Sequence, residues 1–247
     1  MPPEKKERLD KLLTLRGLAP SLSQAQRLIM AGQVLVEDQP SVKAGTRVPF
    51  HCRISLRSKT GKYVSRGGEK LAAALSHFRL NVRDKVALDV GASTGGFTHC
   101  LLEHGAGKVY AVDVVYGQLA WQLRQDPRVV PLERVNARYL RVEDLGEQVN
   151  LITIDVSFIS LTKILPAMLT LAQKGATILA LIKPQFELEK GSTQKGVVRE
   201  PEKHAQAIAA IGDFCRKLGL QQLGIFTSPL LGPKGNKEFF TLLKKPF

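Results

Sequence analysis

From about residue 65 to its end, the chain alternates apolar strand-like segments with helix-like segments, and this alternation is the strongest constraint on its fold. Apolar runs typical of strands occupy 86–90, 108–113, 129–131, 151–155, 177–183, 223–227 and 238–243. Helical spacing of apolar residues is found at 65–79, 98–103, 118–124, 161–171 and 201–218. Strands that alternate with helices are typical of a doubly wound α/β fold with a mostly parallel sheet.

The last two predicted strands are an exception to the parallel order. Only the short Gly/Pro/Asn connection at 231–236 separates them. A parallel crossover needs about a dozen residues or more, so these two strands should pair antiparallel. The sequence therefore predicts a seven-stranded, mostly parallel sheet with one reversed strand.

The first sixty or so residues have a different pattern, which is typical of a small α+β unit. We expect helices at 7–16 and 24–31, strands at 33–37 and 52–57, and a turn at 38–40. Glycines at 17 and 32 are natural ends for the two helices. A polar stretch at 58–63 is typical of a linker. We therefore predict two domains, residues 1–62 and residues 63–247.

Positive charge is concentrated in the first of these segments. The chain has 36 Lys and Arg against 22 Asp and Glu, a net charge of +14, and residues 1–62 hold half of that excess. Such a surface favours a polyanionic partner, most commonly nucleic acid, although a merely basic soluble surface is the plainer alternative. The basic residues that could gather on one face of the small unit are Arg8, Lys11, Arg16, Arg27, Lys43 and Arg47.

Other features of the composition exclude whole classes of protein. No apolar run approaches the roughly 18–20 residues that span a bilayer, and the charged N-terminus lacks the apolar core of a signal peptide. Cys52, Cys100 and Cys215 have no paired spacing. We therefore expect free thiols in the cytoplasm, with neither a disulfide framework nor a metal site.

The sharpest local feature is the loop at 88–98, Leu-Asp-Val-Gly-Ala-Ser-Thr-Gly-Gly-Phe-Thr, which joins a buried strand to a helix. Gly91, Gly95 and Gly96 let the backbone approach a ligand at the carboxyl end of the strand, where open α/β sheets bind ligands. Asp113 ends the next predicted strand, where a carboxylate can accept both hydroxyls of a ribose. The loop therefore predicts a nucleoside cofactor, the alternative being a turn that needs glycine for its geometry alone.

The loop favours S-adenosylmethionine over a dinucleotide. Ser93 stands where the Gly-x-Gly-x-x-Gly pattern of dinucleotide sites has its second glycine. S-adenosylmethionine has no pyrophosphate and needs only an open glycine turn, a ribose-binding acid and a site for its amino-acid end. Asn136, after the third predicted strand, could reach the adenine edge or be an ordinary loop asparagine.

Four charged residues abut apolar segments of the predicted sheet. Asp155 and Lys183 end strands, Glu238 begins the last strand, and Lys70 lies on the predicted helix at 65–79, just before the first of these strands. Charges in such places are costly unless paired, so structural salt bridges are one interpretation. The other is a Lys-Asp-Lys-Glu set around a reacting group.

Methyl transfer to a hydroxyl group is a reaction that would use such a set of four charged residues. The oxygen must be aimed at the methyl carbon and must lose its proton, and a lysine can take that proton where burial and a nearby cation disfavour its charged form. Lys183 is the candidate base and Lys70 the second cation, with Asp155 and Glu238 orienting the two ammonium groups. Methylation of a cytosine carbon would instead need a cysteine nucleophile in a strand-end loop, which neither Cys100 nor Cys215 provides.

Six separated blocks of sequence resemble the TlyA (hemolysin A-like) family in content and order. They lie at 65–71, 89–98, 155–160, 181–187, 195–199 and 235–238. That family joins an RNA-binding domain like that of ribosomal protein S4 to an FtsJ-like methyltransferase domain. The resemblance implies a Rossmann-like fold, S-adenosylmethionine as cofactor, and 2′-O-methylation of ribosomal RNA, usually at cytidine, in free RNA or ribosomal subunits.

The resemblance also implies roles for particular residues. The catalytic tetrad of FtsJ-type enzymes maps onto Lys70, Asp155, Lys183 and Glu238, and Arg66 joins the candidate RNA-binding residues. The cofactor-binding set is Asp89, Gly91, Ala92, Ser93, Thr94, Gly95, Gly96, Phe97, Thr98, Asp113, Asn136 and Asp155. Two positions depart from the family pattern: His99 and Asn136 stand where relatives often have Asp.

Two other functions compete with this one. A non-catalytic RNA-binding assembly factor would hold a nucleoside without transferring a methyl group, and would be recognised by its failure to bind S-adenosylmethionine. A membrane-active hemolysin is disfavoured by the lack of a signal peptide, of a spanning segment and of a strongly amphipathic exposed stretch. Leakage of vesicles caused by the purified protein would revive it.

Overall fold

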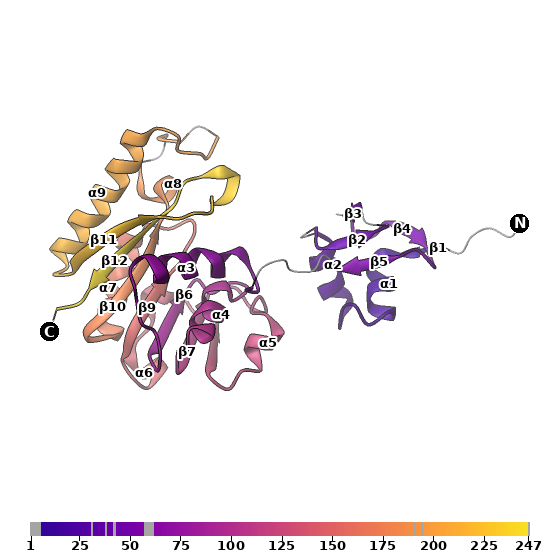
Figure 1. Cartoon of the computed structure of the whole chain (residues 1–247), viewed down its shortest axis with the longest axis horizontal. Coiled ribbons are helices and arrows are strands. Elements are labelled where there is room, and N and C mark those ends of the chain that lie inside the picture. Colours follow the sequence, from indigo (N-terminus) through magenta and orange to yellow (C-terminus); the bar gives the residue numbers. More distant parts are fainter. Residues whose placement is uncertain are drawn as a thin grey trace, which may run out of the picture. The chain divides into compact units, whose positions relative to one another are not determined.

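The computed structural model describes residues 6–30, 32–37, 39–41, 43–56, 62–189, 191–193 and 195–246. The chain separates into two compact units, Met1–Thr60 and Gly61–Phe247, which Figure 1 shows in indigo and in the remaining colours. The predicted linker at 58–63 falls largely outside the described residues. Each unit has its own elements and its own core.

Within its described residues, the first unit contains two short helices and five short strands. The helices are α1 (Leu9–Leu15) and α2 (Leu22–Met30), and the strands are β1 (Lys6–Arg8), β2 (Val34–Val36), β3 (Gln39–Ser41), β4 (Arg47–Pro49) and β5 (Ile54–Leu56). β2 lies between β3 and β5 in one antiparallel sheet, and β1 pairs antiparallel with β4. Leu9, Leu12 and Leu13 of α1 pack with Ala25 and Ile29 of α2 in one buried cluster.

The structure corrects the predicted elements of this unit at two points. Glu7 and Arg8 lie in β1 and not in the first helix, because they pair with Val48 and Arg47 of β4. Residues 39–41, predicted largely as a turn, form β3 alongside β2. Ala31 and Asp38, also part of the predicted elements, lie outside the described residues. The first correction arises from pairing with distant residues of β4, which local pattern does not report, and the second from a short hairpin with the neighbouring β2.

The second unit is organised around a seven-stranded mixed sheet. Its strands are β6 (Val86–Val90), β7 (Lys108–Asp113), β8 (Val129–Glu133), β9 (Val149–Ile154), β10 (Ala172–Ile182), β11 (Gln221–Thr227) and β12 (Phe239–Lys244). Their order is β11-β12-β10-β9-β6-β7-β8. β12 is antiparallel to both of its neighbours, and the other pairs are parallel. The predicted sheet with one reversed strand is confirmed.

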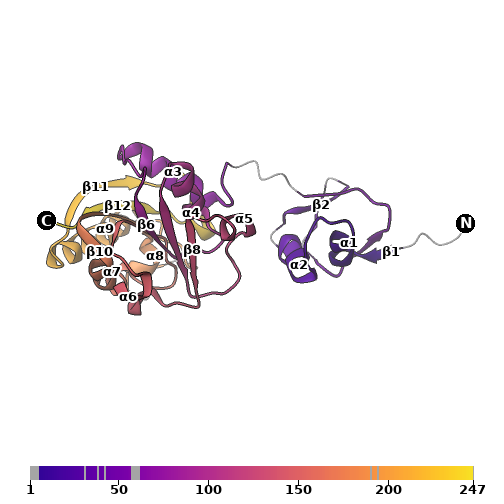
Figure 2. The same ribbon diagram turned by 90° about the horizontal axis from the view of Figure 1, so that it is seen from below.

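Helices cover both faces of this sheet, as Figure 2 shows for α3 on one side and α6 and α7 on the other. The α-helices are α3 (Arg66–His77), α4 (Gly96–Glu103), α5 (Trp121–Arg124), α6 (Val142–Leu145), α7 (Leu165–Leu171), α8 (Pro184–Glu187) and α9 (Pro201–Lys217). Short 3₁₀ turns lie at η1 (Ala137–Tyr139), η2 (Leu161–Lys163) and η3 (Pro233–Gly235). The predicted helix at 118–124 is therefore shorter than expected, and that at 161–171 is divided in two.

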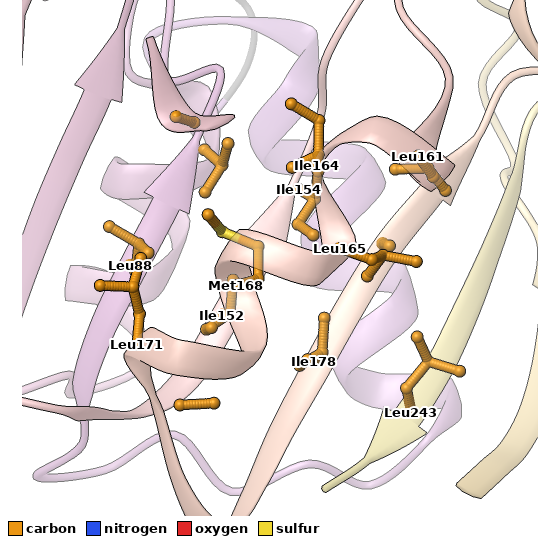
Figure 3. Close-up of a cluster of buried hydrophobic side chains, with 14 of the residues drawn as sticks. Leu88, Ile152, Ile154, Leu161, Ile164, Leu165, Met168, Leu171, Ile178 and Leu243 are labelled. Atoms are coloured by element: carbon orange, nitrogen blue, oxygen red, sulfur yellow. The ribbon is translucent and has the colours of Figure 1, made fainter. Parts of the chain in front are cut away.

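The two cores of this unit follow the period-2 alternation of its strands. Leu88 and Val90 of β6 face one cluster, and Ala87, which directly precedes Leu88, faces the other. In Figure 3, Leu165, Met168 and Leu171 of α7 pack against strand residues of the first cluster. Because both faces are covered, the central strands are predominantly apolar, which is why they were recognisable in the sequence.

Candidate functional site

A cavity of about 310 Å³ lies at one edge of the seven-stranded sheet. Gly91, Asp155 and Lys183 directly follow the parallel strands β6, β9 and β10, so they share the carboxyl edge. Glu238 directly precedes β12, and because that strand runs the opposite way its beginning lies at the same edge. The cavity is lined by Ser65, Arg66, Gly67, Lys70, Gly91, Ala92, Ser93, Thr94, Gly96, Phe97, Asp155, Lys183, Gly232, Pro233 and Glu238.

The glycine loop forms one wall of this cavity and requires glycine at particular points. Gly91 has φ of +83°, and a Cβ there would lie 2.5 Å from the backbone oxygen of Asp155. A Cβ on Gly96 would overlap the Ser65 hydroxyl at the start of α3. These glycines bring three segments of backbone together beside the open space, so the loop can approach a ligand closely.

Asp113 holds the loop from the neighbouring strand. One of its carboxylate oxygens accepts a hydrogen bond of 2.8 Å from the Ser93 backbone, and the other accepts one of 2.8 Å from the Val115 backbone. Ser93 itself has φ of +49°, a conformation uncommon for residues other than glycine. The carboxylate therefore fixes the turn of the loop.

Asp89 and Thr98 lie beneath the loop, not in the cavity lining. Both side chains are fully buried, and Asp89 accepts hydrogen bonds from the Thr98 hydroxyl (2.7 Å) and the Thr153 hydroxyl (3.1 Å). Burial raises the pKa of the Asp89 carboxyl to about 7, although both hydroxyl bonds favour the ionised form. These hydrogen bonds tie β6, β9 and α4 together below the loop, and contact of Asp89 and Thr98 with a cofactor stays a prediction.

Two ion pairs face one another across the sheet edge. Lys70 Nζ lies 2.5 Å from Glu238 Oε2, and Lys183 Nζ lies 2.6 Å from Asp155 Oδ1. The first pair joins α3 to β12 and the second joins the ends of β9 and β10. The structure thus brings together all four residues of the predicted tetrad, and all four line the same cavity.

Because these charges are largely buried, each depends on its own partner for neutralisation. Lys70 and Lys183 are 8% and 6% exposed, and Glu238 is 1% exposed. The other Glu238 oxygen, Oε1, is buried and has no hydrogen-bond partner among the described residues, and it faces Gly232 of the cavity wall. A buried acceptor in this state is a natural partner for a hydroxyl donor entering the cavity.

The structure separates the remaining predicted cofactor residues from the cavity lining. Gly95 packs under the side chains of Leu119 and Leu123, Asp113 contacts the loop as described above, and Asn136 accepts a hydrogen bond from the Arg138 backbone at η1. Their contact with a cofactor stays a prediction. His99, one of the two departures from the family pattern, accepts a hydrogen bond from the Val64 backbone and has a mostly buried side chain.

The candidate RNA-binding residues divide into two groups. Arg8 donates twice to the fully buried Asp10 carboxylate, and this contact is the largest cause of the lowering of the Asp10 pKa to about 2. Arg16 donates to the backbone oxygens of Phe50 and Cys52, so both arginines have structural partners. The residues Lys11, Arg27, Lys43, Arg47 and Arg66 are exposed, and Arg66 also lines the cavity.

Sequence reasoning missed five residues at the site. Ser157 accepts a hydrogen bond of 2.9 Å from Lys183 Nζ. The cavity wall also includes Ser65, Gly67, Gly232 and Pro233. The position of Ser157, two residues after Asp155 at the end of a strand, could have indicated that it belongs to the site. Gly232 and Pro233 were interpreted only as a turn, since nothing local shows that the turn returns to the Gly91 loop.

Comparisons with known proteins agree with this geometry. Residues 63–245 match the FtsJ-like methyltransferase family, and residues 7–51 match the S4 domain. The chain is 46% identical to "16S/23S rRNA (cytidine-2'-O)-methyltransferase TlyA" of Mycobacterium tuberculosis, over 97% of this chain and 90% of that protein. It is 41% identical to "Hemolysin A" of Brachyspira hyodysenteriae, over 94% of this chain and 97% of that protein.

A solved structure is similar over both units. It is named "Putative hemolysin from Streptococcus thermophilus", has 41% sequence identity and a TM-score of 0.76, and is matched over 98% of this chain and 90% of its own. The sheet with one reversed strand, the glycine loop and the S4 match together identify the architecture. The chain belongs to the FtsJ-like methyltransferases, in the TlyA family that carries an S4 domain ahead of the methyltransferase domain.

Proposed function

We propose that this protein transfers a methyl group from S-adenosylmethionine to the 2′-hydroxyl of a cytidine in ribosomal RNA. The observation that carries the proposal is the pair of ion pairs, Lys70–Glu238 and Lys183–Asp155, in one cavity beside the glycine loop. Membership of the FtsJ-like family supports the cofactor and the reaction class. The relative named as a 16S/23S rRNA (cytidine-2'-O)-methyltransferase supports the substrate.

The residues present fit this cofactor. Gly91 and Gly96 let the loop lie against the backbone of Asp155 and the Ser65 hydroxyl at the cavity wall, where a Cβ would collide, and Ala92, Ser93 and Thr94 border the cavity without a bulky side chain. S-adenosylmethionine supplies a methyl group on a positively charged sulfur, which an oxygen nucleophile can attack. We propose that residues 91–97 hold it, with Asp113 bonding its ribose and Asn136 its adenine.

Each member of the tetrad has a distinct role in this proposal. Lys183 receives the proton of the target 2′-hydroxyl at Nζ, and Asp155 and Ser157 hold that nitrogen in place. Lys70 adds a second positive charge to the same cavity, and Glu238 holds that charge in place. The free Oε1 of Glu238 orients a ribose hydroxyl. Positioning of the oxygen contributes as well as the proton transfer.

The RNA is held by basic side chains of both units. We propose that residues 1–62 anchor it through exposed side chains such as Lys11, Lys43 and Arg47, by contacts to phosphates that carry little base specificity. Arg66 lies at the cavity itself. Phe158, 91% exposed and next to Ser157, offers an aromatic face on which an unstacked base can lie. A ribosomal substrate and three free cysteines support action in the cytoplasm.

The decisive experiment replaces Lys183. Lys183→Ala should abolish transfer of labelled methyl groups to ribosomal RNA while RNA binding and cofactor binding survive, because only the proton acceptor is lost. Lys163→Ala, which removes an exposed lysine from η2, is the matched control and should keep full activity. Wild-type turnover by Lys183→Ala would contradict the proposed base.

Two further measurements separate the competing functions. Calorimetry that detects no S-adenosylmethionine binding, with or without RNA, would favour a non-catalytic assembly factor. The hemolysin names of some relatives suggest membrane activity, and dye release from vesicles tests it directly. No helix in the described ranges is both long enough and apolar enough to cross a membrane.

A further inference from the structure

A second cavity, of about 320 Å³, lies in the methyltransferase unit beside the beginning of α9. Its lining is formed by the loop that precedes α9, by His204 near the start of α9, and by the loop that precedes β12. The residues are Val197, Val198, Arg199, His204, Lys234, Gly235 and Lys237. This lining contains three fully cationic side chains and no acidic one.

The cations are not neutralised within the part of the chain that the structure describes. Arg199, Lys234 and Lys237 are exposed, and none forms an ion pair there. The nearby carboxylate of Glu200 lies 3.4 Å from Lys203 and is not part of the lining. Three unpaired positive charges around one cavity create a positive potential that favours an anion.

The buried side chain of Asn236 holds the two loops that line this cavity in a fixed arrangement. Its side chain is 2% exposed, accepts a hydrogen bond of 3.0 Å from the Val198 backbone and donates bonds of 3.0 Å and 3.1 Å to the oxygens of Gly196 and Pro233. The two loops are therefore clamped together through one buried amide. The backbones that carry Arg199 and Lys237 are held relative to each other before any ligand arrives.

The same loop also borders the candidate active site. Gly232, Pro233 and Glu238 line the first cavity, while Lys234, Gly235 and Lys237 line the second. Lys237 and Glu238 are consecutive, with Cα atoms about 3.8 Å apart, and they belong to different cavities. A polymer with its reacting ribose at Glu238 would thus place a neighbouring linkage within reach of Lys237.

We propose that this second cavity binds a backbone phosphate of the RNA strand next to the nucleotide that is methylated. This inference rests on the proposed function and extends it, because it states where the substrate strand leaves the reacting centre. Arg199 from one loop and Lys237 from the other neutralise the phosphate, Lys234 adds charge from the same loop as Lys237, and Asn236 holds the two loops together. A phosphate bound there would fix the position of the target ribose against Glu238.

The test measures the binding of a ribosomal RNA fragment as salt is raised. Arg199→Ala and Lys237→Ala, singly and together, should weaken binding and flatten its salt dependence. Loss of one phosphate contact on a single strand reduces the slope of log binding constant against log salt concentration by about 0.7. The ratio of the variant's dissociation constant to that of wild type should therefore fall about threefold between 50 and 200 mM salt. Lys237→Arg should restore the slope. Lys217→Ala, an exposed lysine in the last turn of α9, is the control of equal charge.

Steady-state kinetics of the variants and an RNA with one neutral linkage provide two further tests of the proposal. The variants should raise KM for RNA and leave cofactor affinity unchanged. Once the target nucleotide is mapped, a neutral methylphosphonate linkage beside it should abolish the difference between wild type and Arg199→Ala. If only kcat falls and the salt slope is unchanged, the cavity does not hold a phosphate of the strand.

Two remaining outcomes also have a definite meaning. Inorganic phosphate that binds wild type but not Arg199→Ala, with no effect of the variant on the RNA slope, would assign the cavity to a small free anion and overturn the proposal. If wild type methylates no ribosomal RNA, the proposed function fails by itself, and the salt slope still tests the phosphate site.

Discussion

Asp89 gives a quantitative prediction, because its carboxyl group is ionisable and completely buried. Its pKa is about 7 in the folded protein and 3.8 for an ordinary aspartate, and burial is the main cause. At 1.36 kcal/mol for each pKa unit, this difference corresponds to about 4 kcal/mol. The folded state therefore binds the proton more tightly than the unfolded state by that amount.

The sign of the effect on stability follows from proton linkage. Between about pH 4 and pH 7 the folded protein holds a proton at Asp89 that the unfolded chain has lost, so this contribution to stability is complete below pH 4 and falls as pH rises to 7. Asp89→Asn removes the titration and keeps one acceptor for Thr98 or Thr153. At pH 4 the variant should be about as stable as wild type, and at pH 7 it should be more stable by up to about 4 kcal/mol.

Urea unfolding at several pH values measures this difference. The only tryptophan of the chain, Trp121, lies in the methyltransferase unit, so its fluorescence assigns the transition to that unit. Asp126→Asn is the control of opposite sign, since Arg128 holds the pKa of Asp126 below its usual range and its stability contribution is lost as pH falls. If the free energies of unfolding of wild type and Asp89→Asn stay parallel from pH 4 to pH 7, the reasoning is refuted.

Three further predictions concern the site and the RNA. Gly91→Ala should raise the dissociation constant for S-adenosylmethionine at least tenfold in calorimetry, because the methyl group meets the Asp155 backbone; Gly146→Ala, with similar φ and open space around it, is the control and should bind normally. Glu238→Ala leaves the Lys70 charge buried without its partner and should lower the free energy of unfolding by about 3–5 kcal/mol, which an unchanged urea midpoint would contradict. Deletion of residues 1–62 should weaken RNA binding and reduce its salt slope in the same fragment assay; an unchanged slope would mean that the RNA anchor lies elsewhere.

The sequence by itself determined the sheet and most of the cavity wall. The central strands are apolar on both faces because helices cover both faces, so β6, β7 and β10 were recognisable from residue type alone. The short connection before β12 was enough to predict the reversed strand. The glycine loop was equally visible, since close backbone approach restricts those positions to glycine.

Only the tertiary structure decided which charged residues meet. Lys70 and Glu238 are 168 positions apart, and they pair because α3 lies against the edge where the reversed strand begins. The same contacts showed that Asp89 supports the loop from below and that Arg8 is held by Asp10. The residue types along a segment indicate whether that segment is buried and which backbone conformation it adopts. Pairing between distant side chains depends on how elements pack, and no single segment encodes it.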